Sequence, residues 1–299
     1  MTVNDRPAMT GEASARSRFR YRPGRMMCRF WRDKVGVVCL AMLVLLLAVA
    51  LLSRFWTPLD PTEQDLLSRL QSPTGAHWLG TDSLGRDILS RLMSATWTAL
   101  TSSLIAVGLA LFGGVLLGLL AGFIEGPFDA VLSRLNDVLL SLPPLLFAVA
   151  IVGALGPNLT NAMIAIGILL LPRFFRLTRV STQAVKREDF VEAARASGAG
   201  VFRILVRHVL PNIASPLVIQ ISFSASVAIV SEAGLSFLGL GAQAPSSSWG
   251  SMTKEGFDRL AESAWSIVPP SVILVFAILV LSLLGDSLRD ASGRQTAGK

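Results

Sequence analysis

Charged side chains are scarce in this sequence. Asp, Glu, Lys and Arg make up 16% of its 299 residues, whereas soluble domains carry about 25%. Hydrophobic residues make up 52% of the chain. This composition indicates a membrane protein before any individual segment is considered.

Cysteine and histidine are also rare. Cys28 and Cys39 do not make a disulfide framework, and no CxxC or Cys/His cluster is present. The two histidines, His77 and His208, lie far apart, so a zinc site would need mostly carboxylate ligands. We therefore expect no metal site.

Motifs that bind nucleotides or carry out catalysis are missing as well. The sequence has no G-x-x-x-x-G-K-[ST] phosphate loop, no H-E-x-x-H, no G-x-S-x-G and no G-x-G-x-x-G after a strand. Ionisable residues are nearly absent from the centres of the apolar runs, where ion-coupled transporters place them; Glu232 is the nearest candidate. Active transport by this chain would have to be driven by a partner.

Long apolar runs are abundant, and a membrane-spanning helix needs roughly 20 such residues. Residues 138–172 carry no charge and are too many for one crossing, and Gly156-Pro157-Asn158 is a turn signal that divides them. The sequence thus predicts an all-α fold with about six spans: 35–52, 92–124, 138–155, 159–175, 212–231 and 267–284. We interpret the first as a retained anchor, since its apolar run is too long for a cleaved signal peptide.

The basic residues give the orientation. If the N-terminus is cytoplasmic, the inner segments hold 21 of the 27 Lys and Arg residues, as the positive-inside rule requires. The net charge of +7 is then a topology signal, and we expect no nucleic-acid partner. The basic stretch 16–22 is a solvated arm that can touch anionic membrane lipid.

Several polar and small residues within or beside the spans have alternative interpretations. Gly114, Gly118 and Gly122 leave one helix face flat, which favours a close neighbouring helix. The stretch 82–94 is typical of an interfacial helix capped by Asp82, with contact to an external binding protein as the alternative. Pro143-Pro144 frees backbone carbonyls that need partners. Three residues are candidates for lining a pathway, although serines also bond to their own helix and a glutamate can rest at the interface: Ser222, Ser226 and Glu232.

The segment 189–211 between the fourth and fifth spans has a helix–glycine–helix pattern. Asp189 and Glu192 suit a helix start, and Gly198 suits a left-handed residue after the helix end. A second helix of about 201–209 would stop before Pro211. On this pattern alone, an ordinary solvated loop and a protein-docking surface are equally supported.

The residues of this segment resemble the permease subunits of binding-protein-dependent ATP-binding-cassette importers. The family signature is E-A-A-x-x-x-G followed after nine residues by I-x-L-P; Glu192-Ala193-Ala194, Gly198 and Leu210-Pro211 match it, with His208 at the isoleucine place. The peptide/nickel branch commonly has R-H-I-L-P-N there, and this chain has R-H-V-L-P-N. Further likeness lies in W-L-G-T-D-S-L-G-R-D-I-L-S-R-L (78–92), L-S-F-L-G-L-G (235–241), P-S-S-S-W-G (245–250) and L-L-G-D-S-L-R-D (283–290).

The resemblance implies the C-type permease of a dipeptide, oligopeptide or nickel importer in a bacterial inner membrane, with both termini cytoplasmic. It implies a second homologous permease, two cytoplasmic ATPases that bind the ATP, an external solute-binding protein, and no enzyme activity or cofactor in this chain. The implied parts are a basic tail (1–34), an anchor with a periplasmic segment (35–95), a five-helix core (96–286) with a coupling loop (173–211), and a second tail (287–299). The implied ATPase-docking residues are Asp189, Glu192, Ala193, Ala194, Ser197, Gly198, Val201 and Phe202.

The rival hypotheses are a secondary carrier or channel working without ATP and a membrane-embedded enzyme. The few spans, the scarcity of intramembrane charge and the long basic loop count against the first. The second lacks a catalytic constellation.

Overall fold

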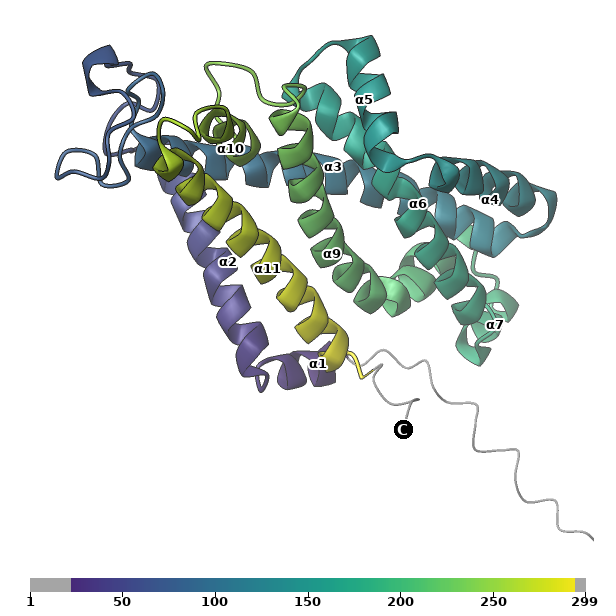
Figure 1. Cartoon of the computed structure of the whole chain (residues 1–299). Coiled ribbons are helices and arrows are strands. Elements are labelled where there is room, and N and C mark those ends of the chain that lie inside the picture. The colour runs from purple at the N-terminus through teal and green to yellow at the C-terminus, as the bar shows by residue number, and fades with distance from the viewer. Residues whose placement is uncertain (1–22, 294–299) are drawn as a thin grey trace, which may run out of the picture.

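The structure is a computed structural model that describes residues 23–293, and these residues form a helical bundle without a strand (Figure 1). The basic stretch 16–22 lies outside the described residues. The helices are α1 (Pro23–Phe30), α2 (Lys34–Leu52), α3 (Ile88–Ile124), α4 (Gly126–Ser141), α5 (Pro144–Leu155), α6 (Leu159–Val185), α7 (Asp189–Ala196), α8 (Val201–Ile204), α9 (Leu210–Phe237), α10 (Trp249–Asp258) and α11 (Val268–Ala291).

Four helical stretches are long and apolar enough to cross a membrane, and they are Lys34–Leu52, Ile88–Ile124, Val201–Phe237 and Ala264–Ala291. A fifth arises if α4 and α5 together count as one broken span, since their axes meet at 93°. The predicted all-α membrane fold is confirmed in this form. The predicted number of six is not confirmed, because α6, which carries Arg173, Arg176 and Arg179, is not among these stretches.

The predicted span 138–155 proved to be broken. The break lies at Leu142 and Pro143, and Pro144 occupies the first turn of α5. A proline has no N–H to continue the hydrogen bonds of a helix, and it fits best at the first helical turn. The two prolines therefore end one helix and start the next. The turn expected at Gly156-Pro157-Asn158 is present, between α5 and α6.

Side-chain caps define where several helices start. Asp33 accepts from the backbone N–H groups of Val35 (3.1 Å) and Gly36 (3.2 Å) at the start of α2, which satisfies two donors that the helix leaves free. The hydroxyl of Ser287 in α11 holds the pKa of Asp33 below its ordinary value, because a hydrogen bond favours the carboxylate. This cap therefore also ties α2 to the end of α11.

The start of α3 differs from the expectation. Its cap is Asp87, which accepts from Ser90 N (2.8 Å), and not Asp82. The stretch 82–94, expected to be an interfacial helix, is a turn followed by the first residues of α3. Asp82 instead accepts from the backbone of Leu84 and Arg86 inside that turn. The boundary predicted at residues 95 and 96 falls within α3.

The closest helix pair is α3 with α6. A Cβ added to Gly114 would lie 2.8 Å from the carbonyl oxygen of Leu171, and one on Gly118 would lie 2.8 Å from that of Phe175. On Gly122 it would lie 2.6 Å from the carbonyl oxygen of Arg179. The predicted flat glycine face therefore exists and receives α6. The largest buried apolar cluster lies beside this seam, between α3, α5, α6 and α9.

The chain passes back and forth between two ends of the bundle. One end, here called the α10 end, holds α10 and the segment 53–87, and the indole of Trp265 donates to the carbonyl oxygen of Leu79 there (2.9 Å). The other, here called the α7 end, holds the junctions of α3 with α4 and of α6 with α7. In Figure 1 the α10 end lies toward the top and α7 toward the bottom.

The close contact between α3 and α6 predicts that a larger side chain destabilises the protein only at those positions of α3 that face α6. Gly118→Leu should destabilise the protein by about 1–3 kcal/mol or more, because overpacking forces two backbones apart. Gly108→Leu on the same helix should be tolerated, since no atom lies within 4 Å of a Cβ there. Thermal unfolding of the two variants in detergent measures the difference. Equal melting temperatures would contradict the assignment of the seam.

Candidate functional site

The segment predicted to dock a partner is a short helix, a tight turn and a second helix at the α7 end. Gly198 has φ +78°, the left-handed conformation that glycine adopts without strain. Ala199 N–H donates to the carbonyl oxygen of Ala194 (3.1 Å) and Gly198 N–H to that of Arg195 (3.0 Å). These two bonds form a Schellman cap. The predicted end of the first helix is confirmed.

The second helix does not stop before Pro211 as predicted. It runs from α8 through a π-helical turn, Leu205–Val209, directly into α9. Leu210 N–H donates to the carbonyl oxygen of Leu205, five residues back. The proline ring would clash with the carbonyl four residues before it in a regular α-helix, and the wider turn removes that restriction. The Asn212 side chain donates to the carbonyl oxygen of His208 (2.6 Å).

The residues predicted for docking are mostly exposed. Phe202 exposes 80% of its surface and Val201 52%, although both are large apolar side chains. Within α7 only Val191 is buried. The other predicted docking residues are exposed, apart from half-buried Ala194; they are Asp189, Glu192, Ala193, Ser197 and Gly198. The structure brings the set together at the α7 end, and its role in docking stays a prediction.

The residues predicted to line a pathway are buried within α9. Ser226 donates to the carbonyl oxygen of Ser222 (3.3 Å) and receives a hydrogen bond from Ser282 of α11 (3.2 Å). Glu232 is 1% exposed and accepts from the hydroxyl of Ser236 (2.6 Å). Their role also stays a prediction.

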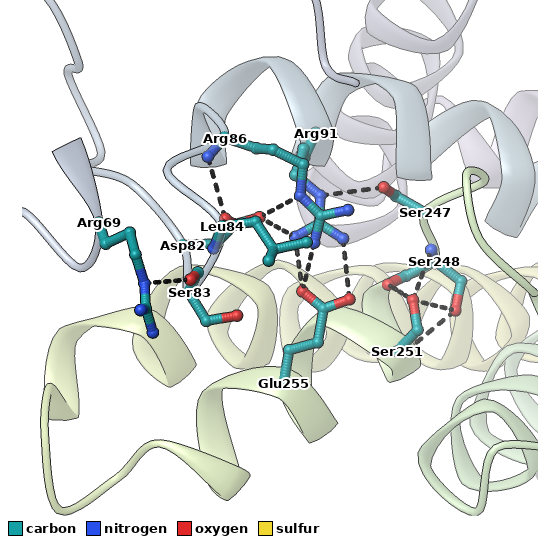
Figure 2. Close-up of polar contacts among 10 residues, drawn as sticks. All are labelled: Arg69, Asp82, Ser83, Leu84, Arg86, Arg91, Ser247, Ser248, Ser251 and Glu255. Atoms are coloured by element: carbon teal, nitrogen blue, oxygen red, sulfur yellow. Dashed lines mark hydrogen bonds and ion pairs between the residues drawn. The ribbon is translucent and has the colours of Figure 1, made fainter. Parts of the chain in front are cut away.

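An ionic cluster at the α10 end joins segments far apart in the sequence (Figure 2). Arg91, whose side chain is 2% exposed, donates to Asp82 and to both carboxylate oxygens of Glu255, at 2.6 and 3.1 Å. Its Nε donates to Ser247 (3.1 Å). Arg86 bonds to Asp82 (2.7 Å) and Glu255 (3.0 Å) as well. The cluster therefore clamps α10 onto the first turn of α3.

The surroundings explain why the cluster holds together. Glu255 remains 35% exposed while Asp82 and both arginines are almost covered. Buried charges are tolerated only when they are paired and hydrogen-bonded. Two guanidinium groups and two carboxylates meet this condition, and the serine hydroxyl takes up a further donor.

Comparison with known proteins places the chain in a family. Residues 114–297 match the family model "Binding-protein-dependent transport system inner membrane component", and residues 23–73 match "N-terminal TM domain of oligopeptide transport permease C". The chain belongs to this family. It is a permease of the type suggested by the glutamate-alanine-alanine motif, in the peptide branch.

Similar curated permeases cover almost the whole chain. The glutathione transport system permease protein GsiD of Pectobacterium atrosepticum is 39% identical over 264 residues, 88% of each chain. The di/tripeptide transport system permease protein DppC of Pseudomonas aeruginosa is 41% identical over 272 residues, 88% of this chain and 90% of the relative. An inward-facing structure of the MetNI methionine transporter has a similar fold, with TM-score 0.56, 18% identity, and coverage of 67% of this chain and 96% of that one.

Sequence reasoning about this permease missed the ionic cluster. Asp82 was expected to cap an interfacial helix, and Arg86 and Arg91 entered only as part of the stretch 78–92 that carries family likeness. Glu255 lies 164 residues from Arg91, so no local pattern connects the two. The available signal was the occurrence of a charge at the very start of a long apolar run, where a partner is required.

The cluster predicts a strong effect of removing its central cation. Arg91→Met should destabilise the permease by on the order of 3–5 kcal/mol, because two carboxylates then share the single guanidinium group of Arg86 and one negative charge is left uncompensated. Lys254→Met on α10 removes a charge from an exposed pair with Asp258 (2.6 Å) and should cost at most about 1 kcal/mol. Thermal unfolding in detergent compares the two. An unchanged melting temperature for Arg91→Met would show that the clamp contributes little.

Proposed function

We propose that this permease forms the translocation pathway of an ATP-driven importer together with a second, homologous permease. Two ATPases bind at the α7 end, and a soluble binding protein delivers the solute at the α10 end. The α7 end then faces the cytoplasm, as do both termini, and the ATP is bound and hydrolysed by the partners. The permease itself carries out no covalent chemistry.

The exposed loop from α7 to α8 is the observation that supports this proposal most. Large apolar side chains such as Phe202 and Val201 are costly to leave in water and are typical of a surface that another protein covers. The small residues Ala193 and Gly198 beside them allow close approach of a groove. The Schellman cap gives the loop one defined shape, so a partner that moves the loop would also move the helices attached to it.

The exposed apolar side chains of α4 and α5 support a partner within the membrane. Leu135, Val138, Leu145 and Leu146 are each more than half exposed. They flank the 93° bend between these helices. At the bend, backbone groups lack helical hydrogen-bond partners, and within a membrane such groups must be covered by protein. The surface of α4 and α5 therefore suits contact with the second permease.

The substrate we propose is a di- or oligopeptide or a related thiol peptide. The similar permeases are named for glutathione and for di- and tripeptides. Nickel chelates, which the sequence resemblance also allowed, gain no support from them. Selectivity among peptides would reside largely in the binding protein.

Co-purification tests the assembly. We expect an ATP-hydrolysing subunit and a second permease to accompany the tagged chain from native membranes in mild detergent. Vanadate, which traps the ATPases, should stop uptake by the intact importer. An ATP-independent carrier or channel would show no such subunit and uptake insensitive to vanadate, and this result would refute the proposal.

The turn at Gly198 allows a sharper test of docking. Gly198→Val should reduce uptake by about tenfold or more, because a positive φ costs an L-residue roughly 1–2 kcal/mol and a β-branched residue more. Gly200→Val places the same bulk two residues away, at φ −66°, which valine adopts freely. Both positions are open, with no atom within 4 Å of an added Cβ. Uptake, membrane insertion and ATPase co-purification are measured for both; equal uptake would show that the turn is not needed.

A further inference from the structure

The docking helix α7 is held to the bundle by few contacts. Val191 is its one buried side chain. Phe190 lies beside the ring of His208, with 6.4 Å between the ring centroids. At the other end of the helix, the guanidinium carbon of Arg195 lies 5.7 Å from the centroid of the Phe123 ring. This last contact connects α7 to the end of α3.

Phe123 also receives a second cation. The ammonium group of Lys186, the residue that ends α6, lies 5.4 Å from the centroid of the same ring. It donates to the backbone carbonyl oxygen of Phe123 (2.6 Å) and lies 3.3 Å from a carboxylate oxygen of Glu125. Carbonyls at a helix end lack partners within the helix and carry partial negative charge. Lys186 and Arg195 thus bring α6 and α7 together on the last turn of α3.

The chain changes direction directly after this point. Glu125, which lies between α3 and α4, has φ +60°, and Gly126, the first residue of α4, has φ +72°. Such a conformation in a non-glycine residue persists only where its surroundings hold it in place. Lys186 is one of the groups that hold Glu125. Beyond the turn, Asp129 of α4 forms an ion pair with Arg179 of α6, with a second bond at 2.5 Å.

We propose that Phe123, with Lys186 and Arg195 on its ring, transmits the motion of the docking helix to the turn between α3 and α4. These are positioning residues: none of them belongs to the docking surface, and none touches ATP or solute. A displacement of α7 moves Arg195, and the shared ring carries this displacement to Lys186 and Glu125. Without the ring, α7 pivots on Val191 and α4 stays in place. This inference rests on the proposed function and names the path by which ATP would act.

The test measures the movement of α4 in the purified complete importer. Spin labels are placed on Val131 of α4 and Val275 of α11, both exposed, after Cys28 and Cys39 are replaced by serine. Distances are recorded by pulsed electron resonance in nanodiscs, with and without ATP and vanadate. We expect ATP to shift the wild-type distance distribution. No solute needs to be identified for this measurement.

Four variants separate transmission from packing. Phe123→Leu keeps apolar bulk but removes the aromatic face, and it should reduce the ATP-shifted population by about tenfold, as expected for loss of two cation–π contacts. Phe123→Tyr keeps the face and should retain the shift. Arg195→Gln should weaken it, and Arg187→Gln, which removes an exposed neighbouring charge, should not. The ATPases should co-purify with all four.

The outcomes are distinct. A full shift in Phe123→Leu, or an equal loss in the Leu and Tyr variants, overturns the proposal, because the aromatic face would then be irrelevant. Loss of the ATPases from Phe123→Leu alone also overturns it, since the ring would then support docking itself. A wild-type importer that binds ATPases while α4 stays still refutes this inference alone. A wild-type chain without any ATP-hydrolysing partner refutes the proposed function and this inference together.

Discussion

The close contact of α3 with α6 is the constraint on which the rest of the permease depends. Three glycines, Gly114, Gly118 and Gly122, let backbone carbonyls of α6 approach where any Cβ would collide. Lipid tails are as apolar as leucine, so helices in a bilayer gain little from apolar burial and associate through such close packing. The two helices therefore form a rigid pair, and the other elements are attached to it.

The attachments differ at the two ends of this pair. At the α10 end, the almost covered charges around Arg91 bind the partly exposed Glu255 and hold α10 against the start of α3. At the α7 end, the contacts are partly exposed and involve single side chains such as Lys186 and Arg195. Breaking a buried network is costly, whereas exposed contacts exchange readily. The α10 end, where solute would be delivered, is therefore held more rigidly than the α7 end, where the ATPases would bind.

The helices and the turn between α7 and α8 could be predicted from the sequence, because both depend on local chemistry. Apolar runs, the Gly156-Pro157-Asn158 turn and the left-handed Gly198 are set by residues within one or two turns of each other. The break at Pro143-Pro144 could not be predicted, because a proline pair can either kink or end a helix, depending on what surrounds it. The partnership of Arg91 with Glu255 also stayed hidden, because it joins residues that meet only after folding. The count of six spans was not confirmed, because apolar length alone does not describe a helix such as α6, in which Arg179 pairs with Asp129 of α4.

The π-helical turn at Leu205–Val209 has a consequence for the whole length of α9. A turn that holds one residue more than an α-turn rotates every following side chain by about 100° around the helix axis. Ser222, Ser226 and Glu232 point into the bundle in the register that this rotation produces. The phase of α9 is therefore set beside the loop between α7 and α8, roughly four to six helical turns before the side chains whose direction it decides.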